Sequence, residues 1–269
     1  MYGAICGDII GSKFEFDRGG KTKDFELFTD EDRFTDDTAM TVAIADGLMN
    51  AGKDAGTDDI KQAVIKSMRD WGHRYPNAGY GGRFWEWLFI SRKPMPYNSY
   101  GNGSAMRVSP AGWFYDSLER TRTVARATAE VTHNHPEGIK GADCTASVIF
   151  LGRNGVGKDD IRKFVDAEFG YDLSESLDDM RKRHKMIITC QDSLPKALKS
   201  FFEGESYEDV VRNAVSLGGD TDTLGAIAGS MAEAFYGIPE TIKTLGKSYL
   251  PNDMLEVLNR FDSSIWKIY

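Results

Sequence analysis

Residue types that mark secreted, membrane-spanning and nucleic-acid-binding proteins are scarce in this sequence. Its 269 residues include only 3 cysteines, far apart and without C-x-x-C spacing, which argues against a disulfide framework and favours a reducing cytoplasm. No apolar run approaches the roughly 18 residues of a membrane span, and Asp8 places a charge too early for a signal peptide. The net charge of −8 argues against broad nucleic-acid binding through a basic face. We therefore expect a cytoplasmic protein.

Strand-like alternation of apolar and polar residues is also nearly absent, and helical periodicity takes its place. Met40, Ile44 and Leu48, for example, recur at the spacing of one helix face. Such patterns predict helices near 37–50, 57–71, 119–131, 137–152, 193–203, 207–216, 222–236 and 252–262. The stretch 154–190 is charged and less periodic. Because no repeat or linker-like change in composition appears, we predict an all-α protein in which residues 1–269 form one domain.

The predicted helix 222–236 is mostly small and apolar on every side, with Gly225, Ala228 and Gly229 among its residues. Such a helix is expected at the centre of a globule, because its small residues let neighbouring helices approach closely. Asp220 and Asp222 would then lie at the N-terminus of a central helix, where the macrodipole favours negative charge.

Two short acidic clusters, 34–38 (FTDDT) and 218–223 (GGDTDT), each precede an apolar helix. Their carboxylates and hydroxyls suit a hard cation such as Mg²⁺ or Mn²⁺. Taken separately, each cluster is also explained by helix capping, because Asp and Thr are favoured at helix N-termini. Gly218 and Gly219 would permit the backbone angles that turn the second cluster inward. If the fold brings both clusters together, about two metal ions would be needed to offset their repulsion.

Other segments are candidates for the rest of a site. Glu15, between two phenylalanines, is either a general acid or base near the metals or an exposed surface residue. The glycines of 79–82 precede a helix and would direct backbone N–H groups at a diphosphate. Tyr100 would stack on a base or ribose, and Asn102 would bind a hydroxyl group. His133 is expected to line a substrate pocket rather than bind zinc, because no cysteine or third histidine lies near it in sequence.

Together these motifs resemble the ADP-ribosylglycohydrolase family, the group of dinitrogenase-reductase-activating glycohydrolase and the ADP-ribosyl-acceptor hydrolases. The matching pieces are Gly3-Ala4-x-x-Gly7-Asp8, Glu15, FTDDT, SYGNGSAMR, THNHPEG and SLGGDTDTLGAIAGSMAEAFYG, which span nearly the whole chain in the family's order. The resemblance implies a compact orthogonal helical bundle with a binuclear Mg²⁺ or Mn²⁺ centre at the base of a cleft. It also implies a monomeric enzyme that releases ADP-ribose from ADP-ribosylated protein side chains, with arginine or serine as the acceptor.

The resemblance also implies roles for individual residues. The implied metal ligands are Thr35, Asp36, Asp37, Asp220, Asp222 and Thr223. The implied catalytic residues are Glu15, Asp36 and Asp37. The implied contacts to ADP-ribose are Gly79, Tyr80, Gly81, Gly82, Ser99, Tyr100, Gly101, Asn102 and His133.

Two alternatives stay open on the sequence alone. Acidic clusters of this kind also serve two-metal phosphoester and diphosphate hydrolases. A non-catalytic ADP-ribose-binding protein is the second alternative. A descendant of that kind would be expected to have lost some of the six metal ligands, all of which are present in this chain.

Overall fold

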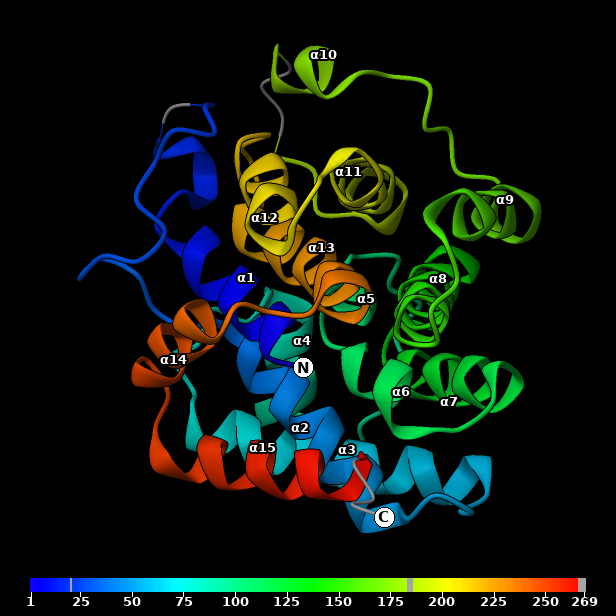
Figure 1. Cartoon of the computed structure of the whole chain (residues 1–269). Helices are drawn as coiled ribbons and strands as arrows, with labels where there is room; N and C mark the ends of the chain where they lie inside the picture. The colour runs from blue at the N-terminus through cyan, green and yellow to red at the C-terminus, as the bar shows by residue number, and fades with distance from the viewer. Residues whose placement is uncertain (20, 183–185, 266–269) are drawn as a thin grey trace.

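The computed structural model describes residues 1–19, 21–182 and 186–265, and helices make up most of this chain (Figure 1). Among these residues, the β pairing is an isolated bridge between Gly101 and Thr189. The prediction of an all-α fold is therefore confirmed.

The helices follow one another along the whole chain. They are α1 (Tyr2–Ser12), the 3₁₀ helix η1 (Glu15–Asp17), α2 (Asp36–Ala51), α3 (Thr57–Arg74), α4 (Gly82–Phe89), α5 (Gly103–Met106), α6 (Ser109–Phe114), α7 (Leu118–Glu130), α8 (Pro136–Arg153), α9 (Lys158–Phe169), α10 (Leu177–Lys182), α11 (Cys190–Glu203), α12 (Tyr207–Val215), α13 (Thr221–Tyr236), α14 (Glu240–Ser248) and α15 (Asn252–Ile265). The predicted helices correspond to α2, α3, α7, α8, α11, α12, α13 and α15.

Helices that are short, or that have apolar residues on only one narrow face, were not predicted from the sequence. Both α9 and α10 lie within the charged stretch 154–190. The buried residues of α9 are Ile161, Val165 and Phe169, each four positions after the last. Because this spacing marks one face of a helix, it is the signal that could have revealed α9.

Helices α1 and α13 pack against each other at the centre of the molecule (Figure 1). A Cβ atom added to Gly7 would lie 2.0 Å from the carbonyl oxygen of Gly225, and one added to Gly3 would lie 2.4 Å from that of Gly229. Residues four apart share one helix face, so these glycines let the two backbones touch along a line. We call Gly3, Gly7, Gly11, Gly225 and Gly229 the glycine seam.

The glycine seam determines where the N-terminus of α13 lies. The hydroxyl of Thr221, in the first turn of α13, donates a hydrogen bond to the carbonyl oxygen of Gly11 at 2.8 Å. Helix α13 is buried over nearly its whole length, as its composition predicted. The acidic residues at the start of α13 are therefore held beside the C-terminal half of α1.

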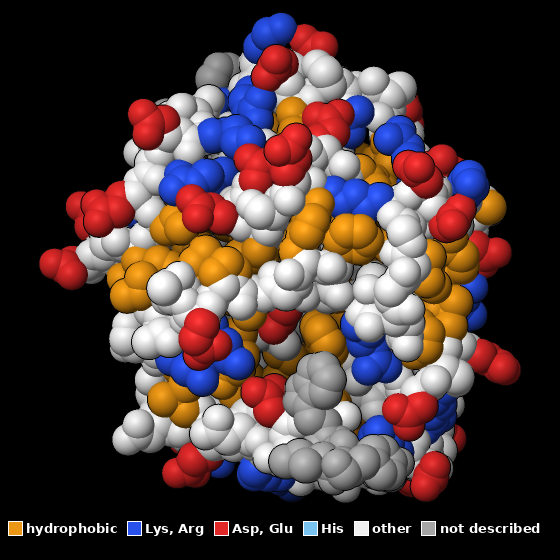
Figure 2. All heavy atoms as spheres, in the orientation of Figure 1, with side chains coloured by type: hydrophobic (Ala, Val, Ile, Leu, Met, Phe, Trp, Pro, Cys, Tyr) orange, Lys and Arg blue, Asp and Glu red, His pale blue; other side chains and the backbone are white. Residues whose placement is uncertain are grey.

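The surface carries charges of both signs. Lys and Arg side chains are interspersed with Asp and Glu over the face drawn in Figure 2, with hydrophobic side chains between them. No helix in the described part of the chain is both long and apolar enough to cross a membrane.

Candidate metal and substrate site

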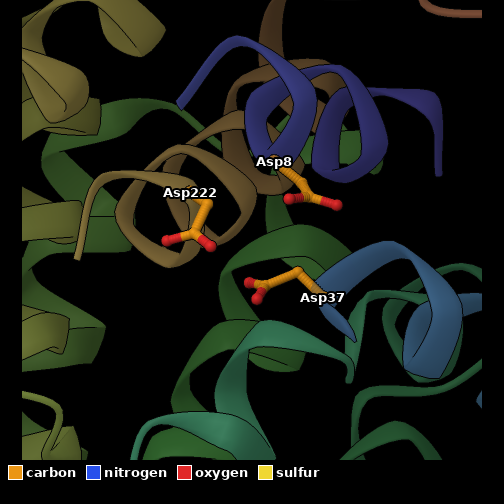
Figure 3. A group of neighbouring side chains, drawn as sticks. All are labelled: Asp8, Asp37 and Asp222. Carbon is orange, nitrogen blue, oxygen red and sulfur yellow. The ribbon is translucent and has the colours of Figure 1, made fainter. Parts of the chain in front are cut away.

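Three aspartates from different helices point toward one another near the centre of the molecule. Asp8 belongs to α1, Asp37 to the first turn of α2 and Asp222 to the first turn of α13 (Figure 3). Each offers a carboxylate oxygen within 4.8 Å of those of the other two. Asp222 also joins a second such group with Glu15 and Asp220. The fold therefore brings the two acidic clusters together.

Asp8 is the acid for which the sequence motifs predicted no role. It is fully buried, and one of its oxygens accepts hydrogen bonds from the backbone N–H groups of Thr35 and Thr38 and from the Thr38 hydroxyl. Its other oxygen accepts from the Thr35 hydroxyl at 2.7 Å. These donors match the roughly four lone-pair sites of a carboxylate, so Asp8 anchors the start of α2 rather than offering itself fully to an ion. A lone charge inside an apolar helix is the signal that could have revealed it.

At the start of α2, helix capping and the acidic group involve different residues. Thr35 is the N-cap residue, and its side-chain oxygen accepts the N–H of Asp37 at 3.3 Å. Asp37 Oδ2 accepts a hydrogen bond from the Thr223 hydroxyl at 3.2 Å. Asp37 Oδ1 is buried and has no hydrogen-bond partner among the described residues. A buried carboxylate oxygen without a partner is costly unless a cation or donor binds it, which points to a ligand at this atom.

The residues at the start of α13 also do more than cap the helix. Gly218 and Gly219 have φ values of 73° and 78°, so the predicted need for glycine at this turn is confirmed. Asp220 is the N-cap residue of α13 but makes no side-chain capping hydrogen bond. Its carboxylate instead accepts a hydrogen bond from Asn102 Nδ2 at 2.5 Å. Helix capping therefore does not account for Asp220.

Burial and mutual repulsion make these acids hard to ionise together. Burial, followed by the charges of Asp8 and Asp220, raises the pKa of Asp36 to about 8. The pKa of Asp37 is raised well above its usual range by burial and then by the charge of Asp222. The pKa of Asp222 is raised in the same way by burial and then by Asp220. A positive charge placed among them would remove this repulsion.

The residues present fit a hard divalent cation. The donors are oxygens of carboxylates and hydroxyls, the set that Mg²⁺ and Mn²⁺ prefer, and Asp37, whose Oδ1 has no partner among the described residues, belongs to the group. Thr223 adjoins the same group of acids, because its hydroxyl donates a hydrogen bond to Asp37. The hydroxyl of Thr35 is bonded to Asp8, so Thr35 lies at the edge of the group.

Glu15 is brought to the acids by an unusual turn. The next residue, Phe16, has a φ of 62°, a left-handed conformation that is rare outside glycine, and its N–H donates to the carbonyl oxygen of Gly219 at 3.0 Å. This bond fastens η1 to the residue before Asp220. Burial, and then the charge of Asp220, raises the pKa of the half-buried Glu15. The structure thus places Glu15 within the acidic group rather than on an open surface.

A cavity of about 460 Å³ adjoins the acids, within the range that small-molecule ligands occupy. The predicted site residues that line it are Glu15, Asp36, Asp37, Gly79, Gly81, Gly82, Ser99, Gly101, Asn102, His133, Asp220, Asp222 and Thr223. The further residues that line it are Phe16, Arg83, Phe84, Tyr97, Gly103, Met106, Arg107, Met186 and Ile188. Most of these were not predicted, because apolar and cationic side chains can be recognised as cavity walls only after the loops have been placed.

Three predicted residues lie outside the lining of this cavity. The ring of Tyr80 packs against Phe84, with ring centroids 5.7 Å apart. Tyr100 is 49% exposed, and its ring packs against His135 at 5.2 Å. Thr35, the third, is held by Asp8 as described above. Their contacts with a ligand stay predictions.

Asn102 contacts the acids directly. Its Nδ2 donates to Ser193 Oγ at 2.9 Å as well as to Asp220, and the residue is buried. Both hydrogens of this amide nitrogen are therefore engaged with the protein. Asn102 orients Asp220, and its carboxamide also forms part of the cavity wall.

These features define an all-α protein with a metal-type carboxylate centre at the edge of a small-molecule cavity. The chain belongs to the ADP-ribosylglycohydrolase family, whose model matches residues 1–265. Family membership supports an enzyme that hydrolyses the bond between ADP-ribose and an acceptor.

Several curated relatives carry names of this kind. The chain is 27% identical to ADP-ribosylhydrolase ARH3 of Mus musculus, with 95% of this chain and 88% of the relative covered. It is 26% identical to ADP-ribosylarginine hydrolase Tri1 of Pseudomonas putida (strain GB-1), over 88% of this chain and 70% of the relative. It is also 26% identical to ADP-ribosyl-[dinitrogen reductase] glycohydrolase of Rhodospirillum rubrum, over 88% of this chain and 84% of the relative.

A solved structure shares the fold. The chain superposes on an ADP-ribosylglycohydrolase-related protein complex with a TM-score of 0.68 at 24% identity, covering 92% of this chain and 94% of the other. This likeness independently supports the all-α architecture described above.

Proposed function

We propose that this protein is a divalent-metal-dependent hydrolase that cleaves the bond between ribose C1″ of ADP-ribose and a modified protein side chain. Arginine is the proposed acceptor, and serine is the alternative. The observation that carries the proposal is the meeting of Asp37, Asp220 and Asp222 beside one cavity, with Asp37 Oδ1 buried and unpartnered. The products would be ADP-ribose and the unmodified acceptor.

The proposed metal ligands are Thr35, Asp36, Asp37, Asp220, Asp222 and Thr223. Two ions of Mg²⁺ or Mn²⁺ held there would supply Lewis-acid chemistry and orient the ribose hydroxyls and a water molecule. Glu15 would exchange a proton at its carboxyl oxygen, a role that suits an acid whose pKa is raised toward neutrality. The hydrogen bond from Phe16 to Gly219 would hold this carboxyl group at the reacting bond.

The glycine loop before α4 would hold the diphosphate. Helix α4 begins at Gly82 without a side-chain capping hydrogen bond, so its first N–H groups are available to an anion. Gly79 has a φ of 113°, and a Cβ atom there would lie 3.3 Å from Asp36 Oδ1. Glycine at this position therefore lets the loop approach the acids closely.

An arginine acceptor is supported by the groups at η1. Glu15 is half-buried and Phe16 is 54% exposed, so a carboxylate and an aromatic face are both available where the cavity opens. A guanidinium group pairs well with a carboxylate and stacks on aromatic rings. The name of the Pseudomonas putida relative, an ADP-ribosylarginine hydrolase, agrees with this choice.

The test is incubation of the purified protein with arginine-linked, serine-linked and nucleotide-linked ADP-ribose, with Mg²⁺ or with EDTA. We expect free ADP-ribose from the arginine-linked substrate only when the metal is present. Asp222→Asn and Asp36→Asn should each reduce turnover by more than about 100-fold, because even outer-shell partners of a metal cost 10–100-fold. Both variants should remain folded, since they remove repulsion rather than packing.

Each contrary result has a distinct meaning. Release of AMP or phosphate would indicate a phosphoester or diphosphate hydrolase, and binding without turnover would indicate an ADP-ribose-binding protein. Full turnover by Asp222→Asn would overturn the metal assignment. A separate readout is the melting temperature, which Mg²⁺ should raise in the native protein but much less in Asp222→Asn.

We further propose that residues 1–269 form one domain that acts as a monomer in the cytoplasm. The three cysteines are buried and unpaired, in keeping with a reducing compartment. Sedimentation analysis that gave a dimer mass would contradict the monomer.

A further inference from the structure

Arg107 is a cation buried beside the cavity. Its side chain is 1% exposed, and Nη2 donates a hydrogen bond to the hydroxyl oxygen of Thr132 at 2.7 Å. Its guanidinium group also lies 5.5 Å from the ring centroid of Phe84. Because a guanidinium group can only donate hydrogen bonds, the oxygen of Thr132 must be the acceptor.

The same hydroxyl continues to His133. Thr132 Oγ1 lies 2.7 Å from Nδ1 of His133, and Thr132 is fully buried. Since Arg107 already supplies one hydrogen to this oxygen, the hydroxyl's own hydrogen is free to be donated, and Nδ1 of His133 is its partner among the described residues. A neutral imidazole that accepts at Nδ1 carries its hydrogen at Nε2.

A hydrogen at Nδ1 would be poorly placed. The oxygen of Thr132 has room to accept it beside the hydrogen from Arg107, but the buried hydroxyl hydrogen of Thr132 would then have no acceptor among the described residues. The doubly protonated ring is also disfavoured, because burial and the charge of Arg107 lower the pKa of His133 well below its usual value. The Nε2–H tautomer therefore gives the buried hydroxyl hydrogen of Thr132 an acceptor and leaves the Nε2 hydrogen for a ligand.

The other ring nitrogen faces the substrate cavity. Nε2 of His133 lies 3.2 Å from the position of a Cβ atom added to Gly103 and has no hydrogen-bond partner among the described residues. His133 lines the cavity, and its backbone N–H donates to the carbonyl oxygen of Ala129 at 2.7 Å. The ring is thus held in place with Nε2 toward the cavity.

We propose that Arg107 and Thr132 fix His133 as the neutral Nε2–H tautomer, so that the site presents one permanent N–H donor to an oxygen of its ligand. Thr132 is a positioning residue, since it acts through His133. The identity of the oxygen rests on the proposed function, in which it belongs to the phosphate or ribose part of ADP-ribose. A donor fixed in this way favours an acceptor oxygen and opposes an N–H group at the same place.

The tautomer is measured first, in the native protein and without an activity assay. Long-range ¹H–¹⁵N spectra of the ¹⁵N-histidine-labelled protein distinguish Nδ1–H, Nε2–H and the imidazolium form, and loss of one set of peaks in His133→Gln assigns the residue. We expect the Nε2–H pattern throughout pH 6 to 8. An Nδ1–H pattern or an imidazolium pattern for His133 in this range would overturn the proposal.

The second measurement tests Thr132 itself. Thr132→Val keeps the shape but removes the hydroxyl, so we expect a mixture of tautomers and a KM about tenfold higher, with kcat changed by less than about twofold. Thr132→Ser should restore both the spectrum and KM. Thr128→Val is the matched control, because it removes a buried hydroxyl in the last turn of α7, one that donates to the carbonyl oxygen of Ala125 and not to His133.

An unchanged tautomer and an unchanged KM in Thr132→Val would overturn the role of Thr132. If that variant does not fold, the native spectrum decides the tautomer by itself. Calorimetry with ADP-ribose separates this proposal from the proposed function. An Nε2–H ring in a protein that does not bind ADP-ribose would contradict the function while leaving the tautomer established.

Discussion

The floor of the site and its rim are built from different kinds of structure. The floor consists of carboxylates on α1, α2 and α13, and Asp8 and Asp37 are 0% and 2% exposed. The rim is made of loops and η1, where Phe16 and Ile188 are each 54% exposed. Packing of the helices fixes the positions of the acids, whereas Phe16 and Ile188 have more than half of their surface in solvent and fewer buried contacts to restrain them. We therefore expect substitutions on the floor to affect the chemical step and substitutions on the rim to affect selection of the acceptor.

Glycine serves the two regions in opposite ways. On the floor, Gly7 is required because the backbone of α13 occupies the space where its side chain would be. On the rim, a Cβ atom at Gly81 or Gly82 would meet nothing within 4 Å. The floor glycines allow helices to touch, and the rim glycines leave room for a ligand.

Gly7→Ala should have the largest effect. Its methyl carbon would lie 2.0 Å from the carbonyl oxygen of Gly225, so α1 and α13 must separate. We expect a loss of at least about 3 kcal/mol in the free energy of unfolding, measured by urea denaturation, together with loss of Mg²⁺ binding. A stable, active Gly7→Ala would show that the glycine seam does not hold the acids together.

Asp8→Asn should have the next largest effect. An amide NH₂ group would face hydrogen-bond donors of Thr35 or Thr38, and the start of α2 would lose its charged acceptor. We expect a loss of about 2–3 kcal/mol in unfolding free energy and weaker Mg²⁺ binding by calorimetry. Asp116→Asn, at a side chain that is 85% exposed, is the control and should change stability by less than about 0.5 kcal/mol. Equal effects in the two variants would contradict the anchoring role.

Asn102→Ala tests the contact between rim and floor. Asp220 would lose the hydrogen bond from the amide, so its carboxylate would be less well oriented. We expect Mg²⁺ affinity to fall by about 10–100-fold with the helical circular dichroism unchanged. Asn154→Ala, which removes an exposed amide at the end of α8, should leave the affinity as it is. A native affinity in Asn102→Ala would mean that Asp220 needs no support from the rim.

Gly82→Ala should have the smallest effect on stability. The added methyl group meets open space at the first residue of α4, so the unfolding free energy should change by less than about 0.5 kcal/mol. Because the methyl group narrows the approach to the N–H groups of α4, KM for an ADP-ribosylated substrate should rise several-fold. A loss of stability comparable with that of Gly7→Ala would remove the distinction between floor and rim glycines.

The floor was largely predictable from the sequence, because its signals are local. Asp36, Asp37, Asp220 and Asp222 stand in short motifs at helix starts, and helix geometry makes such acids point in a defined direction. The central position of α13 followed from its small apolar residues. Asp8 was missed because its partners, the donors at the start of α2, lie 27 and 30 positions away.

The rim was less predictable, because its contacts depend on how loops fold. Tyr100 is predicted to stack on a ligand, and the contact that the sequence did not reveal is the one between its ring and His135. Arg107 and Tyr97 could be recognised as residues of the site only in the structure, where they line the same cavity as His133. No periodicity constrains these segments, so residue type alone could not say which side chains face inward.

The pairing of α1 with α13 also sets an order of events during synthesis. Gly11 and Thr221, which join the two helices, are 210 positions apart. A chain made at roughly 5–20 residues per second therefore carries its first acidic cluster for on the order of ten seconds before the second exists. During that time α13 does not yet exist to cover the glycine face of α1. We therefore expect molecular chaperones to bind this face in the nascent chain. The proposed Mg²⁺ site would therefore be complete only once residue 223 has been synthesised.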